Sequence, residues 1–144
     1  MPSSSILKYS KGSNLQLSTH FKIREMDCPC EDCGTTLVDK LLISQLEAFR
    51  TILGSKLTIT SGYRCPEYQA QLKLRGYETA KGISSHTKGM AADITNGVTP
   101  GHELADIAKR VGFTNIGVGK GFLHVDTRPG GPRLWTYSKR EGIL

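Results

Sequence analysis

The chain has 144 residues, which is the size of one domain and leaves no room for a binding module beside a complete catalytic domain. Hydrophobic residues make up 38% and charged residues 22%, which excludes disordered, collagen-like and coiled-coil proteins. Lysine and arginine outnumber aspartate and glutamate by 19 to 13, so the net charge is +6 and the expected partner is anionic: nucleic acid, acidic lipid or a bacterial wall polymer.

The first half of the chain predicts an arm, a helix and a strand. Residues 1–17 are rich in serine, lysine and glycine and show no periodicity, so they predict a flexible arm before a single domain over 18–144. Apolar residues recur at helical spacing over 38–53, and Gly54 follows as a C-cap. Alternating, β-branched residues over 56–60 then predict a short strand.

The second half predicts helices and strands in alternation, and the high glycine content favours a loop-rich α+β domain over a helical bundle. We expect a helix over 66–75, a loop over 76–88, a strand over 91–94, a helix over 101–111 capped by Thr99, and strands over 114–118 and 122–127. The tail that follows holds half of the net positive charge, through Arg128, Arg133, Lys139 and Arg140 against Glu141.

Two features bear on where the protein acts. No stretch reaches the roughly 18 apolar residues of a membrane helix, so we expect no association with a membrane. The N-terminal residues contain no continuous apolar segment of the kind found in a secretory signal, so we expect synthesis in the cytoplasm. Action outside the cell would then require release by another agent.

Two segments carry histidine and aspartate in a pattern typical of a metal site. His86 and Asp93 lie in one segment, where Gly89 and two alanines allow a close approach of the backbone to its neighbours. His124 and Asp126 alternate on an expected strand and so project from the same face. Two imidazoles and a carboxylate form a common zinc set with a fourth position open to water. A single histidine, however, is more often a surface or hydrogen-bonded core residue than a ligand.

The first of these segments has the motif S-x-H-x-x-G-x-A-x-D, and a strand histidine follows later in the chain. Its fixed positions are Ser84, His86, Gly89, Ala91 and Asp93. This pattern resembles the zinc D-alanyl-D-alanine carboxypeptidases and endolysin peptidases, which share a fold with hedgehog signalling domains. The upstream sequence S-G-Y-R-C-P over 61–66 resembles the S-G-Y-R segment of the same family. The resemblance extends from about His20 to Arg128.

The resemblance implies a fold, a set of ligands and a chemistry. The fold would be α+β of the hedgehog/DD-peptidase type, with a small antiparallel sheet and helices packed on one side. His86, Asp93 and His124 would ligate one catalytic zinc ion, which lowers the pKa of water and acts as a Lewis acid on the amide. Arg64 would bind a substrate carboxylate or polarise the scissile carbonyl, because a guanidinium is always charged and bidentate.

The general base is where the chain departs from the family. Many members carry an acidic residue three positions before the last histidine, or a histidine two positions before it, but here these positions are Gly121 and Phe122. Asp126 is our candidate, because it shares a strand face with His124. An ion pair with a neighbouring arginine is an equally weighted role for it, and the two candidates are Arg64 and Arg128. Weaker alternatives for the base are His102 and Glu103.

The four cysteines form a separate group whose chemistry the sequence leaves open. They are Cys28, Cys30, Cys33 and Cys65. Four thiolates suit a second, structural zinc ion, although their spacing is tighter than in the usual paired arrangement. Disulfides, with three possible pairings, and free buried thiols are the alternatives. A shared zinc ion or a disulfide would each hold the N-terminal segment close to Arg64 through Cys65.

The function expected from the resemblance is that of a zinc metallopeptidase acting on the peptide stems of bacterial peptidoglycan, with D-Ala-D-Ala carboxypeptidase-like cleavage. The alternatives are an L-alanyl-D-glutamate endopeptidase, as in phage endolysins, and a catalytically degenerate module that binds the wall or a partner. The expected partners are the stem peptide and the anionic cell wall, without nucleic acid, and the expected state is a monomer. Without a leader, the chain would reach the wall after release, in phage lysis or as part of a virion.

Overall fold

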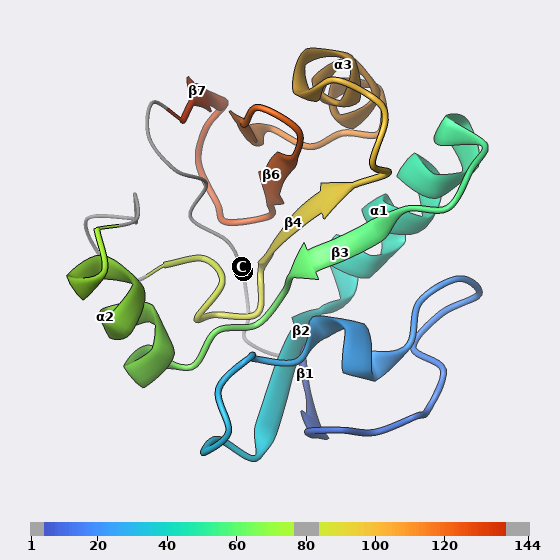
Figure 1. Ribbon diagram of the computed structural model, residues 1–144. Coiled ribbons are helices and arrows are strands. Elements are labelled where there is room, and N and C mark those ends of the chain that lie inside the picture. Colours follow the sequence, from blue (N-terminus) through green and yellow to red (C-terminus); the bar gives the residue numbers. More distant parts are fainter. Residues whose placement is uncertain (1–4, 77–83, 138–144) are drawn as a thin grey trace.

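Helices and two sheets alternate along the chain, which confirms the predicted α+β class (Figure 1). The computed structural model describes residues 5–76 and 84–137, and no helix in this part is long and apolar enough to cross a membrane. In chain order the elements are β1 (Ile6–Ser10), the 3-10 helix η2 (Ile23–Met26), β2 (Thr35–Asp39), α1 (Lys40–Leu53), β3 (Thr58–Ser61), α2 (Pro66–Leu74), β4 (Ala91–Thr95), α3 (Gly101–Arg110), β5 (Asn115–Val118), β6 (Leu123–Asp126) and β7 (Arg133–Thr136). The smaller sheet pairs β1 with β2, and the larger has the order β3-β4-β6-β5-β7.

The larger sheet is mixed, so the prediction of an antiparallel sheet is wrong in one place. Its pairs β3–β4, β4–β6 and β6–β5 are antiparallel, but β5 and β7 run parallel, with Asn115 opposite Arg133. β6 ends at Asp126, which also lies opposite Asn115, so the chain leaves β6 level with the start of β5. The connection over 127–132 crosses to the far edge of β5 at this same level, and β7 therefore points the same way as β5.

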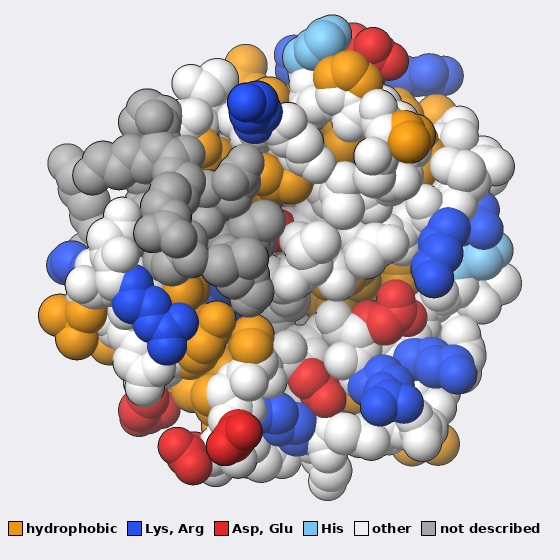
Figure 2. Space-filling model, in the orientation of Figure 1, with side chains coloured by type: hydrophobic (Ala, Val, Ile, Leu, Met, Phe, Trp, Pro, Cys, Tyr) orange, Lys and Arg blue, Asp and Glu red, His pale blue; other side chains and the backbone are white. Residues whose placement is uncertain are grey.

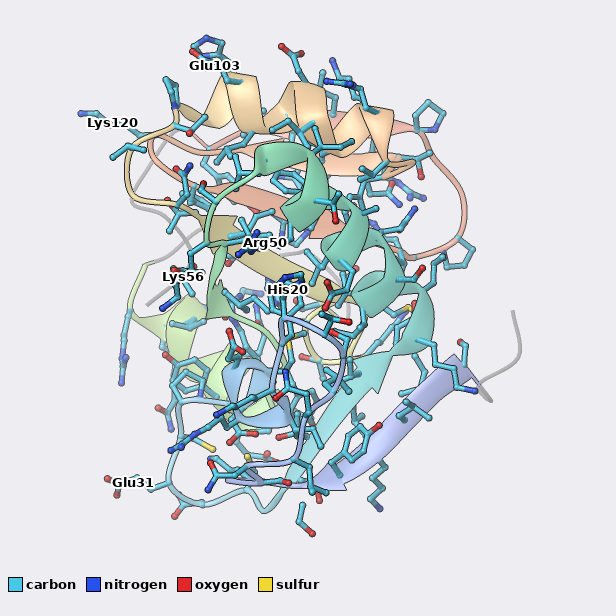
Figure 3. The ribbon with its side chains drawn as sticks, turned by 90° about the vertical axis from the view of Figure 1, so that its right-hand side faces the viewer. His20, Glu31, Arg50, Lys56, Glu103 and Lys120 are labelled. Carbon is cyan, nitrogen blue, oxygen red and sulfur yellow. The ribbon has the colours of Figure 1, made fainter. Side chains whose placement is uncertain are left out.

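The hydrophobic core lies between one face of the larger sheet and helices α1 and α3; Figure 3 looks onto α1 with the strands behind it. Its large, fully buried side chains include Leu42, Leu46 and Phe49 of α1, Leu104 of α3, and Ile94, Leu123 and Val125 of the strands. Successive residues of a strand point to opposite faces of the sheet. Asp93 and His124, which neighbour these core residues in sequence, therefore face away from α1 and α3.

Helix α2 corrects the prediction that the helices pack on one side of the sheet. Its buried residues Tyr68 and Leu72 belong to a second cluster, which also contains Tyr63, Cys28 and Cys65. Figure 1 shows α2 at the other end of the molecule from α1 and α3. Because Pro66 starts the helix soon after β3 ends, the chain turns away from the sheet edge instead of returning over the core face.

The other predicted elements form with small shifts of their ends. The helix predicted over 38–53 begins two residues later, at Lys40, and forms α1. Val38 belongs to β2, and Asp39 caps the helix by accepting the backbone N–H of Leu41 at 3.3 Å. The expected cap of α3 by Thr99 is wrong, because Pro100 occupies the N-cap position and the Thr99 hydroxyl accepts from a side-chain amide. The remaining predicted helices and strands are confirmed within about two residues at each end.

The predicted flexible arm over 1–17 is wrong for the part that forms β1. This strand runs antiparallel to β2, with Ile6 opposite Asp39. Its sequence, I-L-K-Y-S, shows little of the alternation that marks a half-buried strand, and β2 was not predicted either. The strand is held by a backbone ladder, and this is the kind of contact that the composition of one segment does not reveal.

Charged side chains are spread over the described surface. Figure 2 shows lysine and arginine side chains distributed over one face among acidic ones, without a single basic patch. Two of the basic residues expected to concentrate charge in the tail, Lys139 and Arg140, lie outside the described residues, and so does much of the loop predicted over 76–88.

Candidate active site

Two neighbouring strands bring an aspartate and a histidine together on the face of the sheet that α1 and α3 leave free. Asp93 of β4 lies directly opposite His124 of β6 in an antiparallel pair. Their side chains meet, with His124 Nδ1 3.0 Å from Asp93 Oδ1. Asp126 follows on the same face of β6, as predicted, and its Oδ2 lies 2.7 Å from His124 Nε2.

A tight turn after residue 83 delivers the second histidine. The hydroxyl of Ser84 accepts the backbone N–H of His86, and the His86 carbonyl accepts the backbone N–H of Arg64. Gly89 ends the turn at φ +76°, and a Cβ on it would lie 2.7 Å from the backbone carbonyl of Leu37. Only glycine fits this approach to β2, which gives the glycine of the sequence motif a physical reason.

The three predicted metal ligands, His86, Asp93 and His124, form what we call the sheet site. Their donor atoms lie within 4.8 Å of one another, and all three residues are buried. Asp93 Oδ1 is 3.4 Å from His86 Nε2 and 3.0 Å from His124 Nδ1. Neighbouring ligands of a tetrahedral zinc ion, each about 2.0–2.1 Å from the metal, are about 3.4 Å apart. The spacing and the N, O, N donor set therefore fit zinc with an open fourth position.

Each imidazole is oriented by a partner on the side away from Asp93. His86 Nδ1 donates to the carbonyl of Gly62 at 2.7 Å, and His124 Nε2 donates to Asp126. These contacts leave His86 Nε2 and His124 Nδ1, which both face Asp93, as the nitrogens that a metal would use. Metal-binding histidines almost always donate their second N–H to a carbonyl or a carboxylate, and both kinds of partner are present here.

The electrostatics of the sheet site favour an ionised Asp93. Burial opposes ionisation, but the imidazoles of His86 and His124 outweigh it and hold the pKa of Asp93 well below its ordinary value. Burial, with the charge of Arg64, lowers the pKa of His86. Burial also opposes protonation of His124, but Asp126 and Asp93 raise its pKa. The site thus holds a carboxylate between two imidazoles of unequal basicity.

The two residues predicted to be catalytic lie beside the ligands, and both are engaged. The Arg64 guanidinium is buried, with Nη2 3.0 Å from Asp93 Oδ2 and Nε donating to the Ser61 hydroxyl at 2.9 Å. Asp126, which is 1% exposed, holds His124 through Oδ2, while its Oδ1 accepts the backbone N–H of Arg128 and pairs with its side chain, both at 3.3 Å. Of the two ion-pair partners that we considered for Asp126, the structure shows Arg128.

Aromatic residues of β7 and its C-terminal neighbour complete one side of the site, and sequence reasoning missed them. The Trp135 ring lies 5.3 Å from the His124 ring, and the Arg128 guanidinium lies over Trp135 at 5.5 Å. Tyr137 packs near Trp135 and against Phe122. The order R-L-W-T-Y, with two aromatics two residues apart, was the available signal for a strand with one aromatic face.

The weaker candidates for a base lie elsewhere. His102 and Glu103 are at the start of α3, with side chains 75% and 60% exposed, and Figure 3 shows Glu103 on the outside of the molecule. Neither belongs to the metal-binding groups found among the described residues. Their exposure is that of ordinary surface residues.

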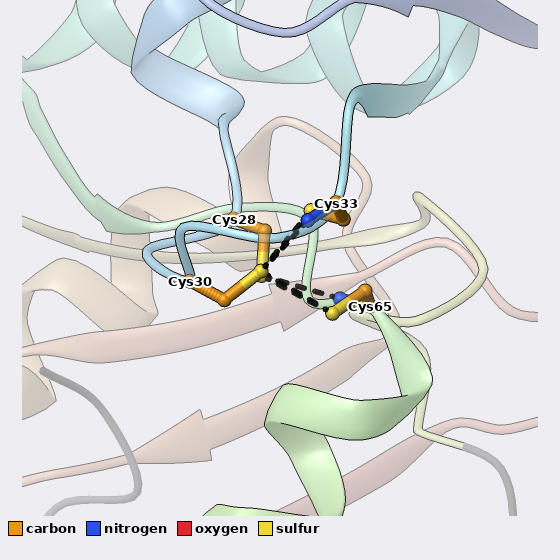
Figure 4. A group of neighbouring side chains, drawn as sticks. All are labelled: Cys28, Cys30, Cys33 and Cys65. Atoms are coloured by element: carbon orange, nitrogen blue, oxygen red, sulfur yellow. Dashed lines mark hydrogen bonds between the residues drawn. The ribbon is translucent and has the colours of Figure 1, made fainter.

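The four cysteines form a second group, the cysteine cluster (Figure 4). They are Cys28, Cys30, Cys33 and Cys65, and no disulfide joins them. Their sulfur atoms lie within 4.8 Å of one another, so the group offers four donor atoms to a metal. Cys65 lies beside the three N-terminal cysteines, as either a shared metal or a disulfide would require.

Comparison with known families gives one match. The model of the family described as Peptidase M15 matches residues 19–126, which is about three quarters of the chain. The matched range contains the sheet site, Arg64, Asp126 and the cysteine cluster. No curated protein and no solved structure matches the chain.

Proposed function

The chain belongs to the peptidase M15 family, and from this premise we propose that it is a zinc-dependent peptidase that hydrolyses the peptide stems of bacterial peptidoglycan. The observation that carries the proposal is the sheet site, where three buried donor atoms converge and both histidines already have orienting partners. Three protein ligands with an open position are typical of catalytic zinc, whereas structural zinc takes four.

His86, Asp93 and His124 would hold the zinc ion, and zinc in such a site polarises the scissile carbonyl and lowers the pKa of the attacking water. The chain's own groups prepare the donors. Gly62 keeps a proton on His86 Nδ1 and Asp126 keeps one on His124 Nε2, which frees the opposite nitrogen of each ring. The ion pair with Arg64 holds Asp93 Oδ2, so that Oδ1 faces the imidazoles.

The roles of Arg64 and Asp126 have different support. For Arg64 we keep the role implied by the family resemblance, which is to bind a substrate carboxylate or to polarise the scissile carbonyl with its fixed positive charge. Asp126 contacts His124 on the nitrogen that faces away from Asp93, which supports an orienting role. Action as the general base would require one Asp126 oxygen to leave His124 or Arg128, so the base role is kept as the alternative that mutation must test.

The finer assignments are proposals as well. We propose D-Ala-D-Ala carboxypeptidase-like cleavage first and L-alanyl-D-glutamate endopeptidase cleavage second, by a single-domain monomer of the hedgehog/DD-peptidase fold. The net charge of +6 supports an anionic wall as the partner. Action after release from a phage-infected cell, or as part of a virion, is the context that we propose.

The direct test is hydrolysis of purified peptidoglycan and of stem peptides, with and without a chelator, followed by mass spectrometry of the products. Cleavage should stop on chelation and return with added zinc, and the product masses identify the bond. His102→Ala, which changes an exposed histidine, is the matched control and should cleave normally. Full activity after complete removal of metal would overturn the proposal.

A binding module of the same family is the second candidate, because Gly121 and Phe122 stand where relatives carry a base. Such a module would bind zinc at the sheet site and bind the wall, but it would release no peptide. Pull-down with insoluble peptidoglycan, run beside the cleavage assay, separates the two functions. Zinc-dependent peptide release would exclude the binding module.

A further inference from the structure

We propose that the cysteine cluster holds a second, structural zinc ion that fastens the loop over 27–34 to the corner between β3 and α2. Three of its four ligands come from that loop and the fourth, Cys65, from the start of α2. The site is separate from the sheet site and does not depend on the chain being a peptidase.

The sulfur positions fit a tetrahedral metal site. Cys28 and Cys65 sulfurs are 3.7 Å apart, Cys30 and Cys65 are 3.6 Å apart, and Cys30 and Cys33 are 3.2 Å apart (Figure 4). Zinc–sulfur bonds of about 2.3 Å in a tetrahedron put the sulfurs about 3.8 Å apart. A disulfide would bring two sulfurs to about 2.05 Å, and all four thiols are free. The spacing therefore matches a shared metal better than a pair of disulfides.

The surroundings stabilise negative charge on sulfur. Lys11 Nζ lies 3.6 Å from the Cys33 sulfur and 3.9 Å from the Cys30 sulfur, and it also donates to the Cys30 carbonyl. Backbone N–H groups point at two sulfurs, from Cys33 to Cys30 at 3.5 Å and from Cys65 to Cys28 at 3.4 Å. Four thiolates on one zinc ion carry a net charge of −2, and such donors are what an outer shell around this charge requires.

The corner that this zinc would fasten also carries parts of the sheet site. Cys65 follows Arg64, the partner of Asp93, and the carbonyl of Gly62 orients His86. Gly62 packs so closely on Met26, just before the cysteine loop, that a Cβ on it would lie 2.7 Å from the Met26 Cα. Anchoring Cys65 to the loop thus keeps Gly62 and Arg64 in place.

The first measurement counts metal and identifies its ligands in the full chain, purified with its zinc under reducing conditions. Wild type should carry two zinc ions per chain, and X-ray absorption should show one zinc with four sulfur neighbours at about 2.3 Å. Cobalt exchanged into this site should give an intense sulfur-to-metal charge-transfer band. Neither readout requires a variant, so a failure of a mutant to fold does not affect them.

Variants then assign each ion to its group. Cys33→Ser should lower the count from two to one and remove the charge-transfer band. His124→Ala should also lower the count to one but keep the band. Glu31→Ala is the matched control in the same loop, since Glu31 is exposed and points outward in Figure 3, and it should keep both ions.

The proposal fails if wild type holds no zinc with sulfur ligands. It also fails if alkylation and mass spectrometry find the cysteines paired as disulfides. The same holds if all four thiols react freely in protein that still carries two zinc ions per chain. A sheet site without zinc, beside a cysteine cluster with zinc, would overturn the proposed function and leave this inference standing.

Discussion

The sheet site and the cysteine cluster differ in what holds their donor atoms in place. In the sheet site, the register of β4 and β6 sets Asp93 opposite His124, and the charges are paired without a metal. In the cysteine cluster, three donors come from a loop between η2 and β2 and the fourth from the start of α2. The first site is built by the register of two strands, whereas the second joins a loop to the start of a helix.

This contrast separates what each metal is needed for. A preorganised site with an open position provides chemistry, and losing its metal should leave the sheet intact. A closed site made by loops contributes folding free energy directly, because the site does not exist in the unfolded chain. Loss of a sheet-site ligand should therefore affect activity most, and loss of a cluster ligand should affect stability most, with any effect of the cluster on activity passing through Gly62 and Arg64.

The largest expected effect is on activity. His124→Ala removes a ligand on the sheet face, so the peptidase rate constant kcat/KM should fall by at least about a thousandfold, equivalent to about 4 kcal/mol. The cysteine cluster should keep its zinc in this variant, which zinc analysis checks alongside peptide release. Substantial peptidase activity without metal at the sheet site would contradict the division between the two centres.

The next effect is on stability. Cys65→Ser removes a cluster ligand, and we expect the free energy of unfolding to fall by about 3 kcal/mol, because the loop loses its anchor. Urea denaturation of the zinc-loaded protein measures the change, with Glu31→Ala as the control. If Cys65→Ser unfolds like wild type, the cluster does not support the fold as we infer.

A smaller effect distinguishes orientation from base catalysis within the sheet site. Asp126→Asn keeps the size of the side chain but removes the carboxylate that holds His124 Nε2, so the zinc affinity of the sheet site should fall by about 10- to 100-fold. If Asp126 only orients, turnover at saturating zinc should be mostly restored, and the pH profile should keep its shape. If the zinc-saturated variant loses turnover, and its pH–rate profile lacks the acidic limb seen in wild type, Asp126 is the general base.

The sequence was sufficient wherever a local pattern set the structure. Helical spacing with a following Gly54 predicts α1, and the alternation of His124 and Asp126 predicts their shared face. It was insufficient for β1, β2 and β7, which are short and form through pairing with distant strands; the two aromatics near the end of the chain are the one signal for β7 that went unused. The parallel direction of β7 likewise depends on the path of the chain around β5.

The same limit applies to the site. The resemblance of the motif to a family predicts His86, Asp93 and His124 as ligands, and the structure brings their donor atoms together. The partners that tune them are not in the motif: the carbonyl of Gly62 carries no side-chain signal, and Trp135 reaches His124 only through the unpredicted β7. Whether Asp126 pairs with Arg64 or Arg128 also depended on three-dimensional contacts.

The smallest expected effect is at Glu47, which contacts neither the sheet site nor the cysteine cluster. It therefore serves as a reference for the effects at the two sites. Glu47 of α1 accepts the Ser18 hydroxyl and the backbone N–H and Nδ1 of His20, which Figure 3 shows beside α1. Burial would raise the pKa of Glu47, but these hydrogen bonds outweigh it and lower the pKa. The folded state therefore favours the carboxylate, and its contribution is present at neutral pH and lost as the pH falls below about 4.3 towards the folded value.

Glu47→Gln should accordingly cost about 1 kcal/mol of unfolding free energy at pH 7 and progressively less at lower pH, once the wild-type carboxyl is protonated as well. Glu103→Gln, on an exposed residue, is the control and should change stability little at either pH. Denaturation of zinc-loaded protein at the two pH values gives the comparison. Because Glu47 contacts neither set of ligands, combining Glu47→Gln with Cys65→Ser should give additive losses. A strong coupling between the two would mean that the cysteine cluster stabilises the whole core and not only its own corner.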